Sequence, residues 1–383
     1  MLRYLACLSS MADWLGPLRV FESITFRTAL GVALAFFIAI FLGRRFIAFM
    51  QRRQAVEDVS KPDSAMLHSL HASKRGTPTM GGVVIIAAIA MAMILVGNLT
   101  NLLSLLAIAV LVAFGLLGLV DDYCKMRGWG KRGLTAGQKL TGQFLLAAGV
   151  ALVLYAFVAH GIYGVVGVEG GKAEARFVTK ILLPFTKWKE VQPDLGLFYY
   201  FLFVLVLVAC SNAVNLTDGL DGLAAGSVLM VAVTFGVFAY VVGNVKIADY
   251  LQIPYVPHSG ELTVFCAVMV GAIMGFLWFN IHPAEIFMGD CGSLALGAAI
   301  AYVALIVKHE IVLLLAGGIF VLEALSVMAQ VASFRWTGRR LLKCAPFHHH
   351  LEFCGWHENK VVVRLWMLGG VLATLALATL KMH

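Results

Sequence analysis

Acidic side chains occur in three stretches at the ends of apolar runs, where they could take part in phosphate or metal chemistry. They are Asp121 and Asp122 in "GLVDDYCK" (118–125), Asp218 and Asp221 in "NAVNLTDGLDG" (212–222), and Asp290 in "NIHPAEIFMGDCGS" (280–293). Carboxylates alone would repel an anionic phosphate, and a divalent cation would remove that conflict. Because oxygen ligands together with phosphate suit Mg²⁺, the pattern predicts a magnesium-assisted site.

Each acidic stretch can also be interpreted as a simple helix cap. Asp218, Asp221 or Asp290 could accept amide hydrogen bonds at the start of the helix that follows. One cap needs one aspartate, however, and capping leaves Asn212 and Asn215 of the same stretch unexplained. Helix N-termini beside a polar pocket would also suit phosphate oxygens, so both interpretations stay open here.

The adjacent pair Asp121 and Asp122 closes an apolar run, where a helix already carries partial negative charge at its C-terminal end. Stability alone disfavours carboxylates there, although Lys125 and Arg127 could balance a solvated helix end. Successive helical residues point about 100° apart, so only one of the two is expected to face a site. The functional alternative is a base or a metal-linked carboxylate.

A histidine triplet and two polar residues in an apolar run are further candidates. His348, His349 and His350 are consecutive, so they cannot all point one way, and their spacing differs from that of structural zinc ligands. They are either solvated loop residues or hydrogen-bond donors to a pyrophosphate or sugar. Glu323 and Gln330 share one helix face and are expected to be buried. A hydrogen bond to a neighbouring helix and a direct role are both open for them.

The elements that must position these groups are membrane-spanning helices. The 383-residue chain is 61% hydrophobic and 13% charged, whereas a soluble protein is about 25% charged. We predict an all-α polytopic membrane protein, one integral domain over 1–383 without a nucleic-acid partner. A span needs about 20 apolar residues, and ten candidates lie near 25–43, 80–97, 100–120, 140–160, 197–214, 222–243, 261–280, 291–307, 311–334 and 361–381.

Basic residues in the connecting segments predict which side of the membrane the polar groups face. Segments after the first, third and ninth spans carry most of the Lys and Arg, and such segments face the cytoplasm. The acidic stretches fall on the same side, so we predict a cytoplasmic site and two extracytoplasmic termini. Segment 161–196 is also basic, but it is long and contains acidic residues too. We therefore assign it as an extracytoplasmic loop between spans four and five.

Taken together, these stretches resemble one enzyme family. The sequence is similar to the bacterial phospho-N-acetylmuramoyl-pentapeptide transferases, the lipid I synthases, within the superfamily of polyprenyl-phosphate sugar-1-phosphate transferases. "SKRGTPTMGG" (73–82) and "APFHHHLE" (345–352) are specific to the muramoyl-pentapeptide branch. The other matching stretches, in family order, are "GLVDDYCK", "GLTAGQKLTGQ" (133–143), "NAVNLTDGLDGLAAG" (212–226), "NIHPAEIFMGDCGS" and "LEALSVMAQV" (322–331).

The resemblance implies a ten-span homodimer in the bacterial plasma membrane with Mg²⁺ as its cofactor. Its substrates would be cytosolic UDP-N-acetylmuramoyl-pentapeptide and undecaprenyl phosphate from the lipid bilayer. Its products would be lipid I, an intermediate of peptidoglycan synthesis, and UMP.

The resemblance also implies roles for individual residues. Asp290 would be the main Mg²⁺ ligand and Asp218 a weaker candidate. Asp121 and Asp122 would serve the acceptor as base or as its orienter, and His348 would join them as a catalytic residue. The lysines would neutralise phosphates, a second group would hold the uridine end, and the histidines would serve the pyrophosphate or sugar. The substrate-binding set is Lys74, Thr79, Lys125, Lys139, Asn212, Asn215, Asp218, Asp221, Asn280, Phe287, Gln330, His349 and His350.

A phosphate monoester has a second pKa near 6, so the acceptor is mostly a dianion at neutral pH. A base then contributes little, and positioning with charge neutralisation should dominate. This favours direct attack on the β-phosphorus over an aspartyl intermediate, which the sequence leaves open. Three rival functions are transfer from UDP-N-acetylglucosamine, secondary transport and phosphate hydrolysis. A transporter would place its polar groups near mid-membrane, and a phosphatase would release inorganic phosphate.

Overall fold

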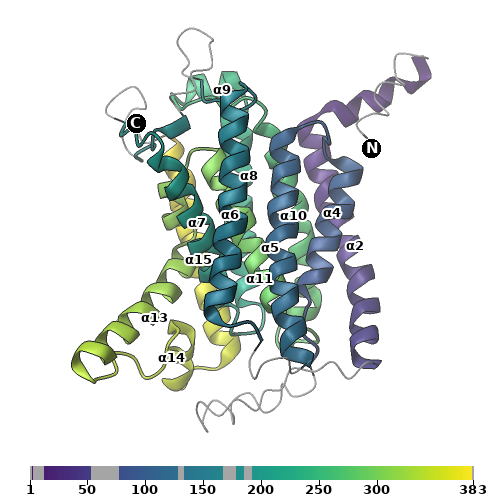
Figure 1. Ribbon diagram of the computed structural model, residues 1–383. Coiled ribbons are helices and arrows are strands. Elements are labelled where there is room, and N and C mark those ends of the chain that lie inside the picture. Colours follow the sequence, from purple (N-terminus) through teal and green to yellow (C-terminus); the bar gives the residue numbers. More distant parts are fainter. Residues whose placement is uncertain are drawn as a thin grey trace.

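The computed structural model describes residues 2, 13–52, 77–127, 133–166, 178–184 and 192–381, and these residues fold into a bundle of helices. Within these ranges the chain forms no β-strand, only two isolated bridges between extended segments. Figure 1 shows the long helices side by side along a common axis. The predicted all-α membrane architecture is therefore confirmed.

Ten helices run along the bundle, one on each predicted span. In the described ranges, nine are long and apolar enough to cross a membrane, and α4, with 15 residues, is the shorter tenth. They are α2 (Ile24–Arg52), α4 (Gly82–Val96), α5 (Leu102–Arg127), α6 (Ala136–Ala159), α7 (Phe198–Thr217), α8 (Leu223–Val242), α10 (Gly260–Asn280), α11 (Gly289–Ile306), α13 (Gly318–Thr337) and α15 (Glu358–Ala378). The short helices are η2 (Asp13–Glu22), α9 (Val245–Tyr250), α12 (Glu310–Ala316), α14 (Phe347–Phe353) and η5 (Thr379–Lys381).

The core of the bundle is built around α10 and α11, whose apolar stretches are 83% and 89% buried. α10 packs against α2 and α8, while α11 packs against α5 and α7. Small residues let helix backbones approach closely in a membrane. A Cβ on Gly297 of α11, for example, would lie 2.7 Å from the carbonyl oxygen of Cys210 on α7. This close packing fixes the first turn of α11, which carries Asp290.

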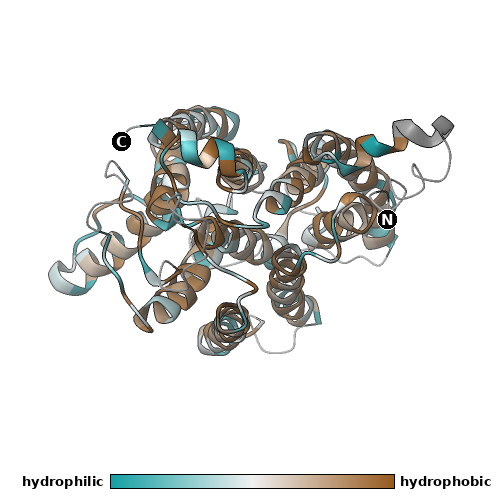
Figure 2. Ribbon diagram, turned by 90° about the horizontal axis from the view of Figure 1, so that it is seen from above, coloured by the Kyte–Doolittle hydropathy of each residue, from teal (hydrophilic) through white to brown (hydrophobic). Residues whose placement is uncertain are grey.

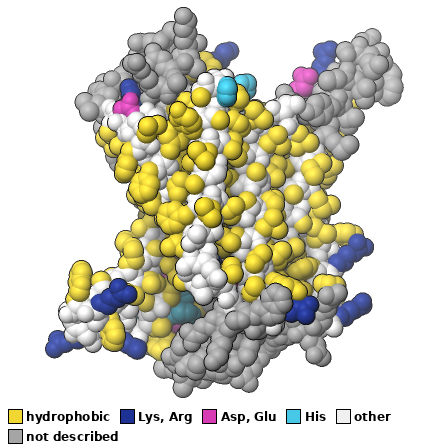
Figure 3. All heavy atoms as spheres, in the orientation of Figure 1, with side chains coloured by type: hydrophobic (Ala, Val, Ile, Leu, Met, Phe, Trp, Pro, Cys, Tyr) yellow, Lys and Arg dark blue, Asp and Glu magenta, His cyan; other side chains and the backbone are white. Residues whose placement is uncertain are grey.

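The flank of the bundle is hydrophobic along most of its length. Figure 3 shows apolar side chains over most of the face drawn, with Lys and Arg toward its two ends and at one edge. Phe37, Leu145 and Leu152 are 67%, 69% and 68% exposed, an arrangement that suits lipid rather than water. Figure 2, which looks along the bundle, shows hydrophobic residues on peripheral as well as central helices. The flank is therefore the surface that faces the bilayer.

The acidic stretches gather at one end of the bundle, called here the site end. α5, α7, α10 and α13 finish there, and α4, α6, α8, α11 and α15 begin there (Figure 1). The described parts of segment 161–196 lie at the opposite end, where Val166 pairs with Tyr255. There the buried Lys308 donates to the carbonyl of Val178 at 3.0 Å and to Glu310 at 2.8 Å. This segment is thus a bundle length away from the acidic residues.

Candidate active site

Two lysines converge on one carboxylate at the site end. Nζ of Lys125 lies 2.6 Å and Nζ of Lys139 lies 2.7 Å from the same oxygen, Oδ2 of Asp290. The same ammonium groups lie 3.1 and 3.5 Å from Oδ2 of Asp121. α5 supplies Asp121 and Lys125 one turn apart, α6 supplies Lys139, and α11 supplies Asp290 in its first turn. Three helices thus bring four charged groups together.

Asp121 is held in place by the backbone that follows α5. Its Oδ1 accepts a hydrogen bond from the N–H of Leu134 at 2.8 Å, which leaves Oδ2 facing the lysines. α6 then begins with a capping box, in which Thr135 and Gln138 satisfy each other's backbone N–H groups. The cap fixes where α6 starts, and hence the direction from which Lys139 approaches.

Asp122 has a different task from its neighbour. Its two carboxylate oxygens accept from the backbone N–H groups of Asp290 at 3.2 Å and Cys291 at 3.0 Å, at the start of α11. A carboxylate there satisfies amides that lack helical partners and favours the positive end of the helix dipole. Asp121 therefore belongs to the charged cluster, whereas Asp122 caps α11, the helix that carries Asp290.

Asn215 completes the cluster from α7. Oriented with its amide nitrogen toward Asp290, it donates to Oδ1 at 2.7 Å and accepts from Nζ of Lys139 at 3.2 Å. The hydroxyl of Ser293, one turn along α11, lies 2.7 Å from the same amide. Both oxygens of Asp290 are therefore engaged, one by two ammonium groups and the other by an amide.

The donor set fits a hard divalent cation. Asp121 and Asp290 offer carboxylate oxygens, the ligands that Mg²⁺ prefers. The ammonium group of Lys125 lies within 3.1 Å of Asp121 and 2.6 Å of Asp290, so the site already favours positive charge between these two residues. With all five groups ionised, the three carboxylates of Asp121, Asp122 and Asp290 outnumber the two ammonium groups of Lys125 and Lys139 by one, a formal charge of −1.

Residues 78–82 form a strap beside this cluster. The N–H of Gly81 donates to the carbonyl of Phe287 and the N–H of Phe287 donates to the carbonyl of Pro78, at 2.8 and 2.9 Å. This pairing places the buried Thr79 next to Gly289. Gly289 has φ +72°, and a Cβ there would lie 2.6 Å from Oδ2 of Asp122. Glycine is therefore required between the strap and the cap of α11.

Asp221 and Asn280 connect two loops at the site end. Asp221 Oδ2 contacts Nδ1 of His282 at 3.0 Å, and the backbone N–H of Asp221 donates to Glu358 at 2.8 Å. Asn280 accepts from the N–H of Gly222 at 3.0 Å and donates to the carbonyl of Ile286 at 2.8 Å. These bonds hold the turn after α7 against the loop after α10. Their predicted contact with the uridine remains a prediction.

The three consecutive histidines point to three different partners, as their spacing predicts. His348 is buried, and both its Nδ1 and its backbone N–H contact Oε2 of Glu323, at 3.1 and 3.3 Å. Its Nε2 faces Gly219 in the turn after α7. His349 contacts Glu352 at 2.7 Å, and His350 accepts from the backbone N–H of Lys343 at 3.2 Å.

Glu323 and Gln330 differ in their surroundings more than the sequence suggested. Glu323 is fully buried and bonds to α14, as one of the two open interpretations predicted. Gln330 is only half-buried, so its predicted burial is wrong. Its side chain accepts from the N–H of Leu342 at 2.8 Å and donates to the carbonyl of Leu342 at 3.1 Å. Only 22% of the apolar stretch of α13 is buried inside the protein, so neighbouring helices cover little of the helix that carries Gln330.

The sequence missed Gln143, a fully buried residue one turn beyond Lys139 on α6. Its amide oxygen accepts from Asn212 Nδ2 at 2.7 Å, and its nitrogen lies 3.4 Å from Ser211, whose hydroxyl reaches the carbonyl of Leu294 at 3.3 Å. This chain of bonds joins α6, α7 and α11, the helices that supply Lys139, Asn215 and Asp290. In the sequence, the sign of this role is a polar glutamine at the start of the apolar stretch of α6.

The remaining predicted residues are less closely tied to the cluster. Asp218 follows the end of α7, and its N–H lies 3.4 Å from the carbonyl of Asn215. Phe287 is half-buried on the loop that pairs with the strap. Lys74 lies outside the described residues. Of the predicted set, the structure therefore brings Asp121, Lys125, Lys139, Asn215 and Asp290 into direct contact, with Asp122 behind them.

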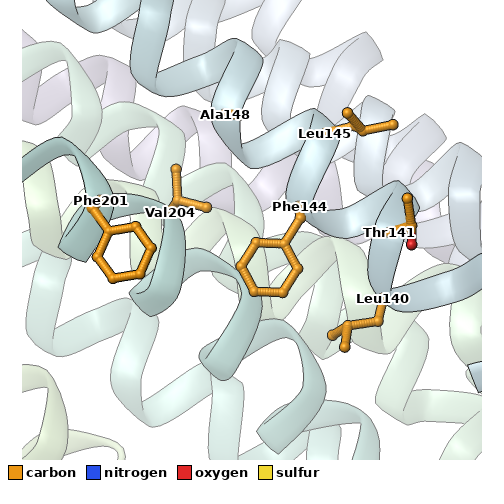
Figure 4. Close-up of a pocket in the computed structure, with 7 residues that line it drawn as sticks. All are labelled: Leu140, Thr141, Phe144, Leu145, Ala148, Phe201 and Val204. Carbon is orange, nitrogen blue, oxygen red and sulfur yellow. The ribbon is translucent and has the colours of Figure 1, made fainter. Parts of the chain in front are cut away.

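An apolar pocket opens between α6 and α7, close to the charged cluster. Its volume is about 440 Å³, and Figure 4 shows Phe144 and Leu145 of α6 with Phe201 and Val204 of α7 along its wall. Leu140, which directly follows Lys139, lines one end of it. A hydrocarbon chain in this pocket would lead from the bilayer toward a lysine of the site.

A lipid-facing helical bundle with carboxylates and lysines gathered at one end is typical of an integral membrane protein with a charged site at one membrane surface. The profile of Glycosyl transferase family 4 matches residues 104–308, and the phospho-N-acetylmuramoyl-pentapeptide-transferase signature 1 matches residues 74–86. Two curated relatives carry the name phospho-N-acetylmuramoyl-pentapeptide-transferase. The one from Oleidesulfovibrio alaskensis is 43% identical over 96% of both chains, and the one from Citrifermentans bemidjiense is 44% identical over 95% of both. The chain belongs to the phospho-N-acetylmuramoyl-pentapeptide-transferase family.

Proposed function

We propose that the protein transfers phospho-N-acetylmuramoyl-pentapeptide from UDP-N-acetylmuramoyl-pentapeptide to undecaprenyl phosphate, releasing UMP and forming lipid I. The names of its relatives support the transferred group and the type of reaction. The observation that carries the proposal is the convergence of Lys125 and Lys139 on Asp290 at one end of a lipid-facing bundle. Such a cluster can accept two phosphorylated reactants, one from water and one from the bilayer.

The chain's own residues would act mainly by positioning charge. The acceptor phosphate is largely a dianion near neutral pH, so it can attack the β-phosphorus of the donor directly. Lys125 and Lys139 are placed to neutralise phosphate oxygens in the transition state. Asp121 is placed to hold both ammonium groups while they do so. Because the acceptor already carries the negative charge of a nucleophile, we favour direct transfer over an aspartyl intermediate.

We also propose Mg²⁺ as the cofactor, with Asp290 as the main ligand and Asp121 as a neighbouring oxygen donor. Asp218 remains a further candidate ligand at the end of α7. When bound, the cation would offset the negative charge that develops on the pyrophosphate.

The two substrates would reach the cluster from different directions. Lys74, Thr79, Phe287 and the loops held by Asp221 and Asn280 are proposed to bind the uridine end. The apolar pocket beside Leu140 supports entry of the acceptor's isoprenoid chain from the bilayer. Basic residues at the site end favour a cytoplasmic site with extracytoplasmic termini, and a homodimer remains part of the proposal.

Purified protein with Mg²⁺, undecaprenyl phosphate and UDP-N-acetylmuramoyl-pentapeptide tests this function directly. We expect UMP and a lipid-linked sugar in equal amounts, and no release of inorganic phosphate. A parallel reaction with UDP-N-acetylglucosamine should give little UMP. Equal turnover of both donors would refute the proposed specificity, and phosphate release would indicate a hydrolase instead.

A further inference from the structure

The site-end part of α13 leaves the bundle and projects beside it (Figure 1). Residues 333–343, which comprise the last turn of α13 and the turn after it, are called here the α13 elbow. Trp336 is 85% exposed and Leu341 is 63% exposed, although both are large apolar residues. Only 22% of the apolar stretch of α13 is buried inside the protein. The elbow therefore lies against lipid at the level where the hydrophobic flank ends.

The elbow is also strongly basic. Arg335, Arg339 and Arg340 are exposed, and no aspartate or glutamate occurs between Glu323 and Glu352 in the sequence. Among the described residues, the structure gives these three guanidinium groups no carboxylate partner. Figure 3 shows Lys and Arg beside hydrophobic side chains at the free end of α13. Unpaired positive charge and exposed aromatic surface thus occur together.

The elbow is held in one conformation rather than left as a loose turn. Gly338 adopts φ +67° and its N–H donates to the carbonyl of Phe334 at 3.0 Å, which ends α13. The hydroxyl of Ser333 donates to the carbonyl of Arg339 at 3.0 Å. The two bonds between Gln330 and the backbone of Leu342 close the turn. The arginines therefore project from a preformed backbone.

We infer that the α13 elbow is a binding site for the headgroups of anionic phospholipids, such as phosphatidylglycerol, in the leaflet at the site end. Tryptophan prefers the interface between hydrocarbon and headgroups, which places the neighbouring arginines at the level of the lipid phosphates. Guanidinium groups bind phosphate oxygens through two parallel hydrogen bonds. The adjoining hydrophobic flank favours a lipid over a soluble anionic partner.

Two hydrogen bonds connect the elbow to α14, which lies beside the active site. Lys343, at the end of the elbow, donates through its backbone N–H to His350 and through Nζ to the carbonyl of Phe353, at 3.2 Å each. Both partners belong to α14, which also carries His348 against Gly219. The inference therefore includes a second part, resting on the proposed function: anionic lipid at the elbow stabilises α14 in its position and raises turnover.

The test compares Arg339→Gln/Arg340→Gln with a matched control, Arg44→Gln/Arg45→Gln. Arg44 and Arg45 are also an exposed adjacent pair toward the site end, on α2, but they lie far from α14 in the fold. Native mass spectrometry of each protein titrated with dioleoylphosphatidylglycerol or dioleoylphosphatidylcholine measures binding without any need for activity. Each basic residue near an anionic membrane surface contributes about 1 kcal/mol. Loss of two should therefore weaken phosphatidylglycerol binding about 30-fold, at 1.4 kcal/mol per factor of ten.

We expect the wild type to prefer phosphatidylglycerol, the elbow variant to lose that preference, and the control to keep it. Equal loss in both variants, or no preference in the wild type, would overturn the inference. Matching elution profiles and melting temperatures show that the elbow variant is folded.

Release of UMP in nanodiscs, with and without phosphatidylglycerol, tests the second part. Turnover should rise with the anionic lipid in the wild type and in the control, and stay flat in the elbow variant. A rise in all three proteins would refute the link to α14. If no nanodisc supports UMP release, the proposed function fails, while the binding result still decides whether the elbow recognises lipid.

Discussion

The division of work between Asp121 and Asp122 can be tested by removing each carboxylate in turn. Asp122→Ala leaves the N–H groups of Asp290 and Cys291 without their acceptor in a buried place. An unsatisfied buried donor costs about 1–3 kcal/mol, so two should cost roughly 2–6 kcal/mol. This free energy is lost where α11 begins, so we expect that turn to open more often.

Cys291 provides the assay, because its thiol is buried beside one of the two affected N–H groups. If labelling by a maleimide follows local opening, a loss of about 2 kcal/mol should speed labelling about 30-fold or more. Asp122→Asn keeps one acceptor oxygen and should give a smaller increase. Asp121→Asn should change the rate much less, because both capped N–H groups donate to Asp122 and neither donates to Asp121.

Cys266 is a built-in control, since it is buried in α10 away from the cap. Its labelling rate should stay low in every variant. An unchanged rate at Cys291 in Asp122→Ala would refute the capping role. Equal acceleration at Cys266 would show a loss of global stability instead of an opening at the start of α11.

Three further predictions address the cluster and its supports. Asp290→Asn should abolish UMP release while the protein still purifies as a folded species; turnover near that of the wild type would remove Asp290 from its central role. Gln143→Leu and Asn212→Leu should be non-additive in a double-mutant cycle of thermal stability, with a coupling of about 1 kcal/mol, whereas strictly additive losses would contradict the bond between them. Gly289→Ala should reduce both stability and turnover because of φ +72° and the contact with Asp122. Gly137→Ala in α6, where a Cβ meets nothing within 4 Å, should keep turnover and leave stability equal or slightly higher, because alanine is the better helix former. A harmless Gly289→Ala would show that the strap can move aside.

The sequence alone predicts the features that depend on local composition. Hydropathy located all ten helices, because a span must be apolar along its own length whatever its neighbours are. The three acidic stretches were found at helix ends for the same reason, since an isolated charge is unfavourable in hydrocarbon. α2 nevertheless continues to Arg52, past the predicted end at 43, because a helix does not have to stop where the apolar run stops.

Only the tertiary structure decided which of these residues meet. Asp290 has no Lys or Arg near it in the sequence, yet Lys125 and Lys139 contact it from 165 and 151 residues away. The sequence allows Asp290 to cap α11 itself. In the structure Asp122, 168 residues away, accepts the hydrogen bonds at the start of this helix. These contacts depend on how three helices pack and rotate about their axes. The hydropathy and charge of the sequence do not predict how each helix is rotated. That rotation depends on the close contact of small residues between neighbouring helices.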